Sequence, residues 1–168
     1  MDLRTKQQPL KQQYRDEPTD ALITLKAKGA SEDTPVACSV DIGRAVYAAQ
    51  AHSGVGGPGT AARSGDLLLG ALAACAQITC QMVATAMDLR VNRIEVEAEG
   101  DLDLRGTLGV SRDVPVGFEE IRLRFVIDAP ELDNEQLESL IEKSERYCVV
   151  MQTLSSPGRL MTGWTRPA

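Results

Sequence analysis

The chain has 168 residues, of which 43% are hydrophobic and 25% charged, the size and balance of one globular domain. Its net charge of -6 would repel a phosphate backbone, so we expect no nucleic-acid partner. Residues 1–18 are polar, which argues against a secretory signal or anchor and favours the cytoplasm. With a single histidine and no CxxC pair, we expect neither a metal site nor a cofactor.

The first part of the domain is predicted to be a sheet followed by a loop. Residues 1–18 are expected to form an arm with little structure, ahead of one domain over residues 19–168. Ala21 to Lys28 alternates apolar and polar residues, which predicts a strand with one wet face. Residues 36–50 predict one or two further strands. Residues 53–65 are rich in Gly, Ser and Ala and predict a loop.

A long apolar helix is predicted next, over Leu67 to Met87, a segment without a charged residue. Ser64 can cap it, and Asp66 lies near the positive end of its dipole. The segment is long enough to cross a bilayer, but acidic residues flank it and polar residues interrupt it. We therefore expect a helix buried on all sides in a soluble protein. One small sheet offers too little cover for such a helix, which favours an interlocked homodimer.

Two complementary strands follow this helix. Ile94 to Leu104 alternates apolar with acidic residues, and Ile121 to Ile127 alternates apolar residues with Arg122 and Arg124. The acidic and basic wet faces suit cross-strand pairing. Residues 106–117, between the two strands, are predicted to leave the sheet before the chain returns to it.

The last predicted element is an amphipathic helix. Asp133 and Gln136 have the spacing of a capping box. Apolar and small residues then follow helical spacing as far as Cys148: Leu137, Leu140, Ile141 and Ser144. Strands, an inserted helix, further strands and a final helix indicate an α+β fold.

Two cysteines lie on the apolar sides of the predicted helices. Cys75 shares a face with Leu68, Ala71, Thr79 and Met82, and Cys148 lies close in angle to Leu137 and Ile141. Such positions are also typical of cysteines that only pack in a core, as we expect for Cys38. Cys80 is about 8.6 Å from Cys75 along a helix, whereas a disulfide needs less than about 7 Å. A disulfide partner of Cys75 would therefore come from elsewhere in the fold.

Three segments resemble the OsmC/Ohr family of cysteine-based hydroperoxide reductases. These are SGDLLLGALAACAQIT at residues 64–79, EAEGDLDLRGTLG at 97–109, and ERYCVVMQTL at 145–154. The resemblance implies antiparallel sheets packed around a long buried central helix in an intertwined homodimer. It also implies that Cys75 attacks an organic hydroperoxide, that Cys148 resolves the sulfenic acid, and that a dithiol, such as a lipoyl group, reduces the disulfide.

The family resemblance also implies an arginine that stabilises the thiolate, held by a glutamate ten residues before the first cysteine. Gly65 occupies that position here, and Asp66 is the nearest carboxylate. Arg15 best matches the arginine, because it immediately precedes the first predicted strand. Weaker candidates are Arg44 and Arg63, and any of the three is otherwise a solvated surface charge.

The substrate pocket is expected to be apolar, lined by Leu68 and Met82. His52 either lines it and donates a proton to the leaving alkoxide or hydrogen-bonds its own loop. Arg146 either lowers the pKa of Cys148 or belongs to a polar helix face. Besides a peroxidase, the missing glutamate leaves open a non-catalytic relative that binds a small apolar or thiol ligand. A redox sensor is a third possibility.

Overall fold

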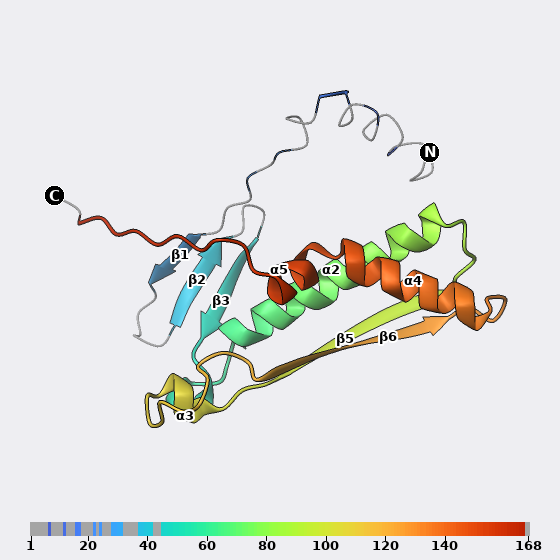
Figure 1. Ribbon diagram of the computed structural model, residues 1–168. Coiled ribbons are helices and arrows are strands. Elements are labelled where there is room, and N and C mark those ends of the chain that lie inside the picture. Colours follow the sequence, from blue (N-terminus) through green and yellow to red (C-terminus); the bar gives the residue numbers. More distant parts are fainter. Residues whose placement is uncertain are drawn as a thin grey trace. The chain divides into compact units, whose positions relative to one another are not determined.

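The computed structural model describes residues 45–166 without a break (Figure 1). Before them it describes residues 28–31 and 37–41 and positions 7, 12, 16, 17, 22 and 24, so the predicted arm lies mostly outside the described residues. The chain forms two compact units. The first contains residues 1–71 and 97–124, and the second contains residues 72–96 and 125–168.

The first unit contains a four-stranded sheet in the order β1-β2-β3-β4. Its strands are β1 (Lys28–Ser31), β2 (Ala37–Asp41), β3 (Val46–Gln50) and β4 (Ala62–Arg63). The first three pair antiparallel, whereas β3 and β4 pair in parallel. Two strands within residues 36–50 are thus confirmed. Strand β1 begins at Lys28, and of the residues predicted to precede it in a strand over 21–28, Leu22 and Thr24 are described and are not in a strand, while the others lie outside the described residues.

The loop after β3 is held by one side chain. The Gln50 side-chain oxygen accepts hydrogen bonds from the backbone N–H groups of Thr60 and Ala61, both at 3.1 Å. A single turn, η2 (Ser53–Val55), lies within the loop, and Gly56 leaves it with a φ of 89° that favours glycine. The glycine-rich stretch is therefore a fixed turn beside the sheet.

Helix α2 (Ser64–Ala86) begins earlier than predicted. Ser64 is its first residue rather than its cap, and the Asp66 carboxylate accepts the Arg63 backbone N–H at 3.0 Å, as an acidic third residue does in a capping box. One face is buried within the chain: Leu72, Ala76, Cys80, Val83 and Ala84. The opposite face, which carries Ile78 and Met82, is exposed, so a single chain does not bury this helix on all sides.

Strands β5 (Arg93–Asp101) and β6 (Glu120–Asp128) form a second sheet, and alternate residues of each are exposed, as predicted. Arg124 contacts Glu97 at 2.6 Å and Arg122 contacts Asp101 at 3.0 Å, which confirms the cross-strand charge pairing. The first of these strands ends at Asp101 rather than Leu104. Asp103 accepts the Arg105 N–H and caps the short helix α3 (Leu104–Thr107), which takes the chain out of the sheet.

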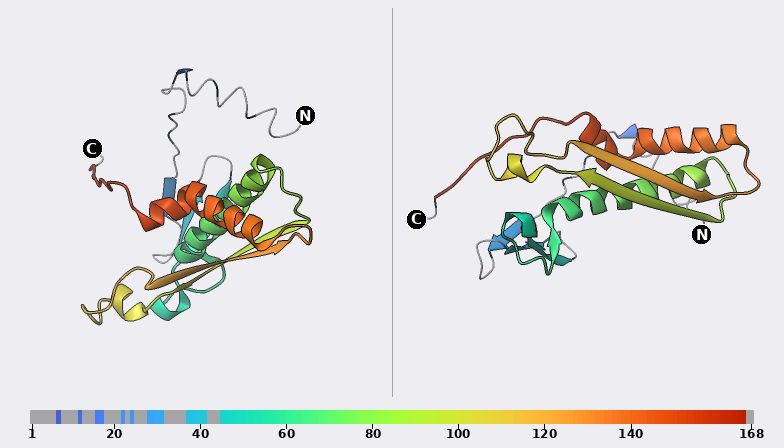
Figure 2. Two further views of the ribbon diagram at one scale, coloured as in Figure 1. Left: turned by 45° about the vertical axis from the view of Figure 1, so that its right-hand side comes forward. Right: turned by 90° about the horizontal axis from the view of Figure 1, so that it is seen from below.

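The second unit packs helix α4 (Asn134–Tyr147) beside the C-terminal part of α2 (Figures 1 and 2). The predicted capping box of Asp133 and Gln136 is present. The buried centre of this core consists of Cys80, Val83, Ala84 and Leu140, surrounded by Met87, Leu89, Val91, Ile94, Phe125 and Ile127. By length and composition α2 could cross a membrane, but here it forms part of this core. The α+β class and its antiparallel strands are thus confirmed.

Candidate active site at Cys75 and Cys148

The helix predicted to run as far as Cys148 ends one residue earlier, and a break in the helical segment follows. Helix α4 ends at Tyr147 and α5 (Val149–Ser155) begins two residues later, with Cys148 between them in an extended conformation (φ -75°, ψ 107°). Cys148 is nevertheless fully buried. The thiol is therefore buried although Cys148 does not lie on a continuous helix.

Gln152 stabilises this break. In a continuous α-helix the Val149 N–H would donate to the Glu145 carbonyl. Instead the side-chain amide of Gln152 donates to that carbonyl at 3.0 Å. The N–H groups of the first turn of α5 have no acceptor within their own helix, so they are available to another partner.

That partner is the sulfur of Cys75, which reaches the break from α2. The backbone N–H groups of Val150 and Val149, the Cys148 thiol and the Thr79 hydroxyl all hydrogen-bond to it. Burial by itself raises the pKa of the Cys75 thiol, but these four hydrogen bonds outweigh it, and the pKa lies below its ordinary value. The fold thus favours a thiolate at Cys75.

Cys148 has the opposite character. Burial raises the pKa of its thiol above the ordinary value, and the neighbouring Cys75 sulfur raises it further. The guanidinium of Arg146, which one interpretation of the sequence assigned to lowering this pKa, lies over the Tyr147 ring, 5.7 Å from the ring centre. One sulfur of the pair is therefore disposed to be charged and the other to carry a proton.

Cys80, the third cysteine whose side chain is described, belongs to the core. Cys80 is fully buried, and burial raises the pKa of its thiol, an effect that a hydrogen bond with Ser144 only partly offsets. Ser144 in turn donates its hydroxyl to the Leu140 carbonyl at 2.6 Å. A thiol in such surroundings is inert.

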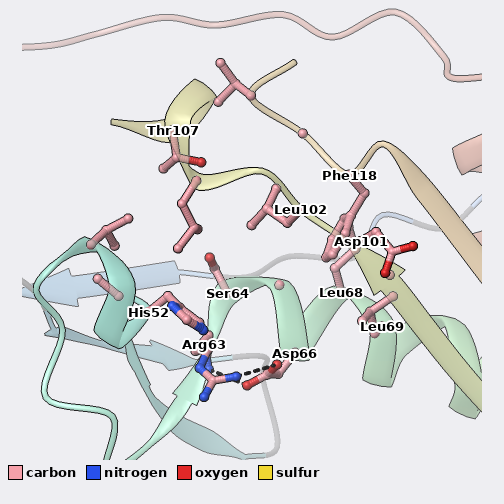
Figure 3. Close-up of a pocket in the computed structure, with 17 residues that line it drawn as sticks. His52, Arg63, Ser64, Asp66, Leu68, Leu69, Asp101, Leu102, Thr107 and Phe118 are labelled. Carbon is pink, nitrogen blue, oxygen red and sulfur yellow. Dashed lines mark hydrogen bonds and ion pairs between the residues drawn. The ribbon is translucent and has the colours of Figure 1, made fainter. Parts of the chain in front are cut away.

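Two of the three predicted substrate-binding residues, His52 and Leu68, line a cavity of about 850 Å³ in the first unit (Figure 3). Its lining is mostly apolar, with the polar side chains of Arg63 and Asp66 at one side. His52 Nδ1 accepts the Gly54 N–H at 2.9 Å, so the neutral ring carries its proton on Nε2. The histidine thus both hydrogen-bonds its loop and lines the cavity. Met82 lies outside this cavity, on the exposed face of α2 in the second unit.

Gly65 stands at the position that the family resemblance assigns to a glutamate, and the Phe118 ring packs against it. A Cβ atom at Gly65 would lie 3.2 Å from Cζ of Phe118. The neighbouring Asp66 is engaged by Arg63, through the backbone N–H and an ion pair at 3.8 Å. The candidate arginines Arg15 and Arg44 lie outside the described residues.

Sequence reasoning placed Thr79 on the face of Cys75 without a role, and it missed Phe118, Gln152 and the two valine amides. Backbone donors carry no signal in a residue pattern. Within residues 45–166 and the other described positions, no group of His, Cys, Asp and Glu side chains could hold a metal ion.

Residues 57–160 match the OsmC-like protein family. Three solved structures are similar to the chain. An OsmC-like protein from Mycoplasma pneumoniae has 18% identity and a TM-score of 0.67, covering 80% of this chain and 89% of its own. An organic hydroperoxide resistance protein from Elizabethkingia anophelis has 20% identity and a TM-score of 0.64, covering 80% and 90%. Another from Legionella pneumophila has 17% identity and a TM-score of 0.60, covering 81% and 92%. At such identities the likeness shows the fold alone, and a comparison with curated proteins finds no match.

Proposed function

We propose that this chain, which belongs to the OsmC-like protein family, is a thiol-dependent peroxidase that reduces organic hydroperoxides to alcohols. The observation that carries the proposal is the hydrogen-bonded pair of Cys75 and Cys148, in which one pKa is lowered and the other raised. A peroxidase of this kind needs a thiolate to attack and a second thiol beside it to resolve the product.

In the first step the Cys75 thiolate attacks the terminal oxygen of the hydroperoxide. The O–O bond breaks, Cys75 is oxidised to a sulfenic acid, and the other oxygen leaves as an alkoxide. The Cys148 thiol, which hydrogen-bonds to Cys75, supplies the proton that turns the alkoxide into an alcohol. Cys148 then becomes a thiolate at the moment when its partner becomes electrophilic.

In the second step the Cys148 thiolate attacks the Cys75 sulfenic sulfur. A disulfide forms, and the hydroxide that leaves takes up a proton as water. An external dithiol, for which a lipoyl group is a candidate, then supplies two electrons and two protons to restore both thiols.

Further residues are proposed to contribute to the site. We assign His52, Leu68 and Met82 to substrate binding, and Arg15 to the support of the thiolate, with Asp66 as its possible anchor. Apolar residues are exposed along α2 and in the C-terminal segment, including Ile78, Leu160 and Trp164. A second copy of the chain would cover them, so we propose a cytoplasmic homodimer.

The test is intact-mass measurement after one equivalent of cumene hydroperoxide, on the wild type and on Cys148→Ala. The wild type should lose two hydrogen atoms as the disulfide forms, and the variant should accumulate one added oxygen on Cys75. Cys80→Ala is the matched control, and it should behave as the wild type because Cys80 is a fully buried core residue whose raised pKa keeps its thiol inert. Unchanged masses in all three proteins would refute the peroxidase.

The second candidate is a non-catalytic protein that binds a small apolar or thiol ligand. The Phe118 ring over Gly65 favours it, because the carboxylate that would hold an arginine is absent. It predicts ligand binding without consumption of hydroperoxide in the presence of a dithiol, so the same protein samples discriminate the two.

A further inference from the structure

The ring of Phe118 forms part of the wall of the cavity that His52 and Leu68 also line (Figure 3). The ring fits between two glycines, Gly65 in the first turn of α2 and Gly100 on β5. A Cβ atom added at Gly65 would lie 3.2 Å from the ring, and one added at Gly100 would lie 2.7 Å from it. A side chain at either position would push against the ring. The two glycines therefore give this aromatic surface its place in the cavity wall.

Most of the other side chains around the cavity are aliphatic. They come from η2, from the start of α2 and from the segment between β5 and β6: Val55, Leu68, Leu69, Leu102, Leu104 and Val116. Leu102 is 41% exposed and Val116 is 66% exposed, so apolar surface continues from the cavity to the outside. A volume of about 850 Å³ lies within the range of cavities that hold small organic molecules.

The charged side chains of the lining are paired within the protein. Arg63 and Asp66 form an ion pair with each other at 3.8 Å. The Asp101 carboxylate accepts a hydrogen bond from Arg122 at 3.0 Å. His52 is uncharged here, because its Nδ1 accepts a backbone hydrogen bond. Among the described residues that line the cavity, none therefore offers an unpaired charge, and an ionic ligand would lose water without gaining a partner of opposite charge.

We propose that this cavity binds small uncharged apolar molecules, which contact the Phe118 ring, and that it discriminates against ionic ones. An uncharged ligand loses little hydration on entry and gains contact with the apolar walls. The link to turnover rests on the proposed peroxidase function, in which such ligands would be uncharged organic hydroperoxides. Binding itself does not rest on that function, since it depends only on the walls of the cavity.

The experiment compares two fluorescent probes, phenylnaphthylamine and anilinonaphthalenesulfonate, titrated into the whole chain at neutral pH. The two probes share one ring system, and only the second carries a sulfonate. Val116→Asp adds a carboxylate to the cavity wall. Leu108→Asp is the matched control, because Leu108 is exposed in the same segment but does not line the cavity. Both native side chains are largely exposed, so neither change should disturb folding.

We expect phenylnaphthylamine to bind at least about tenfold more tightly than the sulfonate, and Val116→Asp to weaken its binding by about tenfold. Leu108→Asp should bind it as the wild type does. Equal affinities for the two probes, or no binding of the uncharged one, overturn the proposal. Equal affinity of Val116→Asp and Leu108→Asp for the uncharged probe also overturns it. Should Val116→Asp unfold, Leu102→Asp is measured against Leu108→Asp in the same way.

Consumption of cumene hydroperoxide is followed separately on the same protein. Binding of the uncharged probe without consumption supports the cavity site and refutes the peroxidase. Consumption without binding of the probe overturns the cavity site and leaves the peroxidase supported.

Discussion

Replacing Val149 by proline removes one backbone donor from the Cys75 sulfur. Val149 is the first residue of α5, the position where a helix tolerates proline best. Proline requires an extended residue before it, and Cys148 already has φ -75° and ψ 107°. The Val149 side chain is 71% exposed, so its loss should cost little.

The size of the effect follows from the hydrogen bond that is lost. A hydrogen bond to a charged group contributes about 1.5–3 kcal/mol. Because several donors share the Cys75 sulfur, we take about 1 kcal/mol for one of them, which corresponds to about 0.7 pH unit. Because these donors lower the pKa of Cys75, removing one raises it. At a pH below the midpoint, the fraction of thiolate then falls by about fivefold.

The assay is site-resolved alkylation of Cys75 across pH, with Val149→Ala as the control that trims the side chain but keeps the N–H. The proline variant should have the higher midpoint, while far-ultraviolet circular dichroism of the two variants remains the same. Equal midpoints in two folded variants would refute the role of the Val149 amide in stabilising the thiolate.

Further predictions concern contacts within each of the two units. Leu140→Ala, at a fully buried position, should lower the free energy of unfolding by about 2–5 kcal/mol in urea denaturation; a loss below 1 kcal/mol would contradict the assigned core. Gly100→Ala should destabilise by about 1–3 kcal/mol, because the new Cβ would lie 2.7 Å from the Phe118 ring, and Phe118→Ala should relieve that penalty in a double-mutant cycle. Gln152→Ala exposes the Glu145 carbonyl and should cost about 0.5–1.5 kcal/mol by the same denaturation. If Gln152 also holds the break in place, its variant raises the alkylation midpoint of Cys75; an unchanged midpoint would mean that the break is set by burial of Cys148 alone.

Local patterns predicted the elements whose formation depends on neighbouring residues. The alternation of Glu97 with its apolar neighbours predicted β5, and the spacing of Asp133 and Gln136 predicted the start of α4. The same patterns failed at element ends, where tertiary pairing decides. Asp103 ended β5 three residues early by capping α3.

The sequence by itself determined that this is an acidic α+β chain with the two cysteine segments of its family, because alternation, helical spacing and capping are properties of neighbouring residues. Only the tertiary structure decided how the thiols differ. The segment ERYCVVMQTL has no glycine or proline to predict a break, yet the burial of Cys148 and the Gln152 hydrogen bond to Glu145 accompany one. That break releases the amides that meet Cys75 from a distant part of the chain, and a pKa depends on such three-dimensional neighbours rather than on residue order.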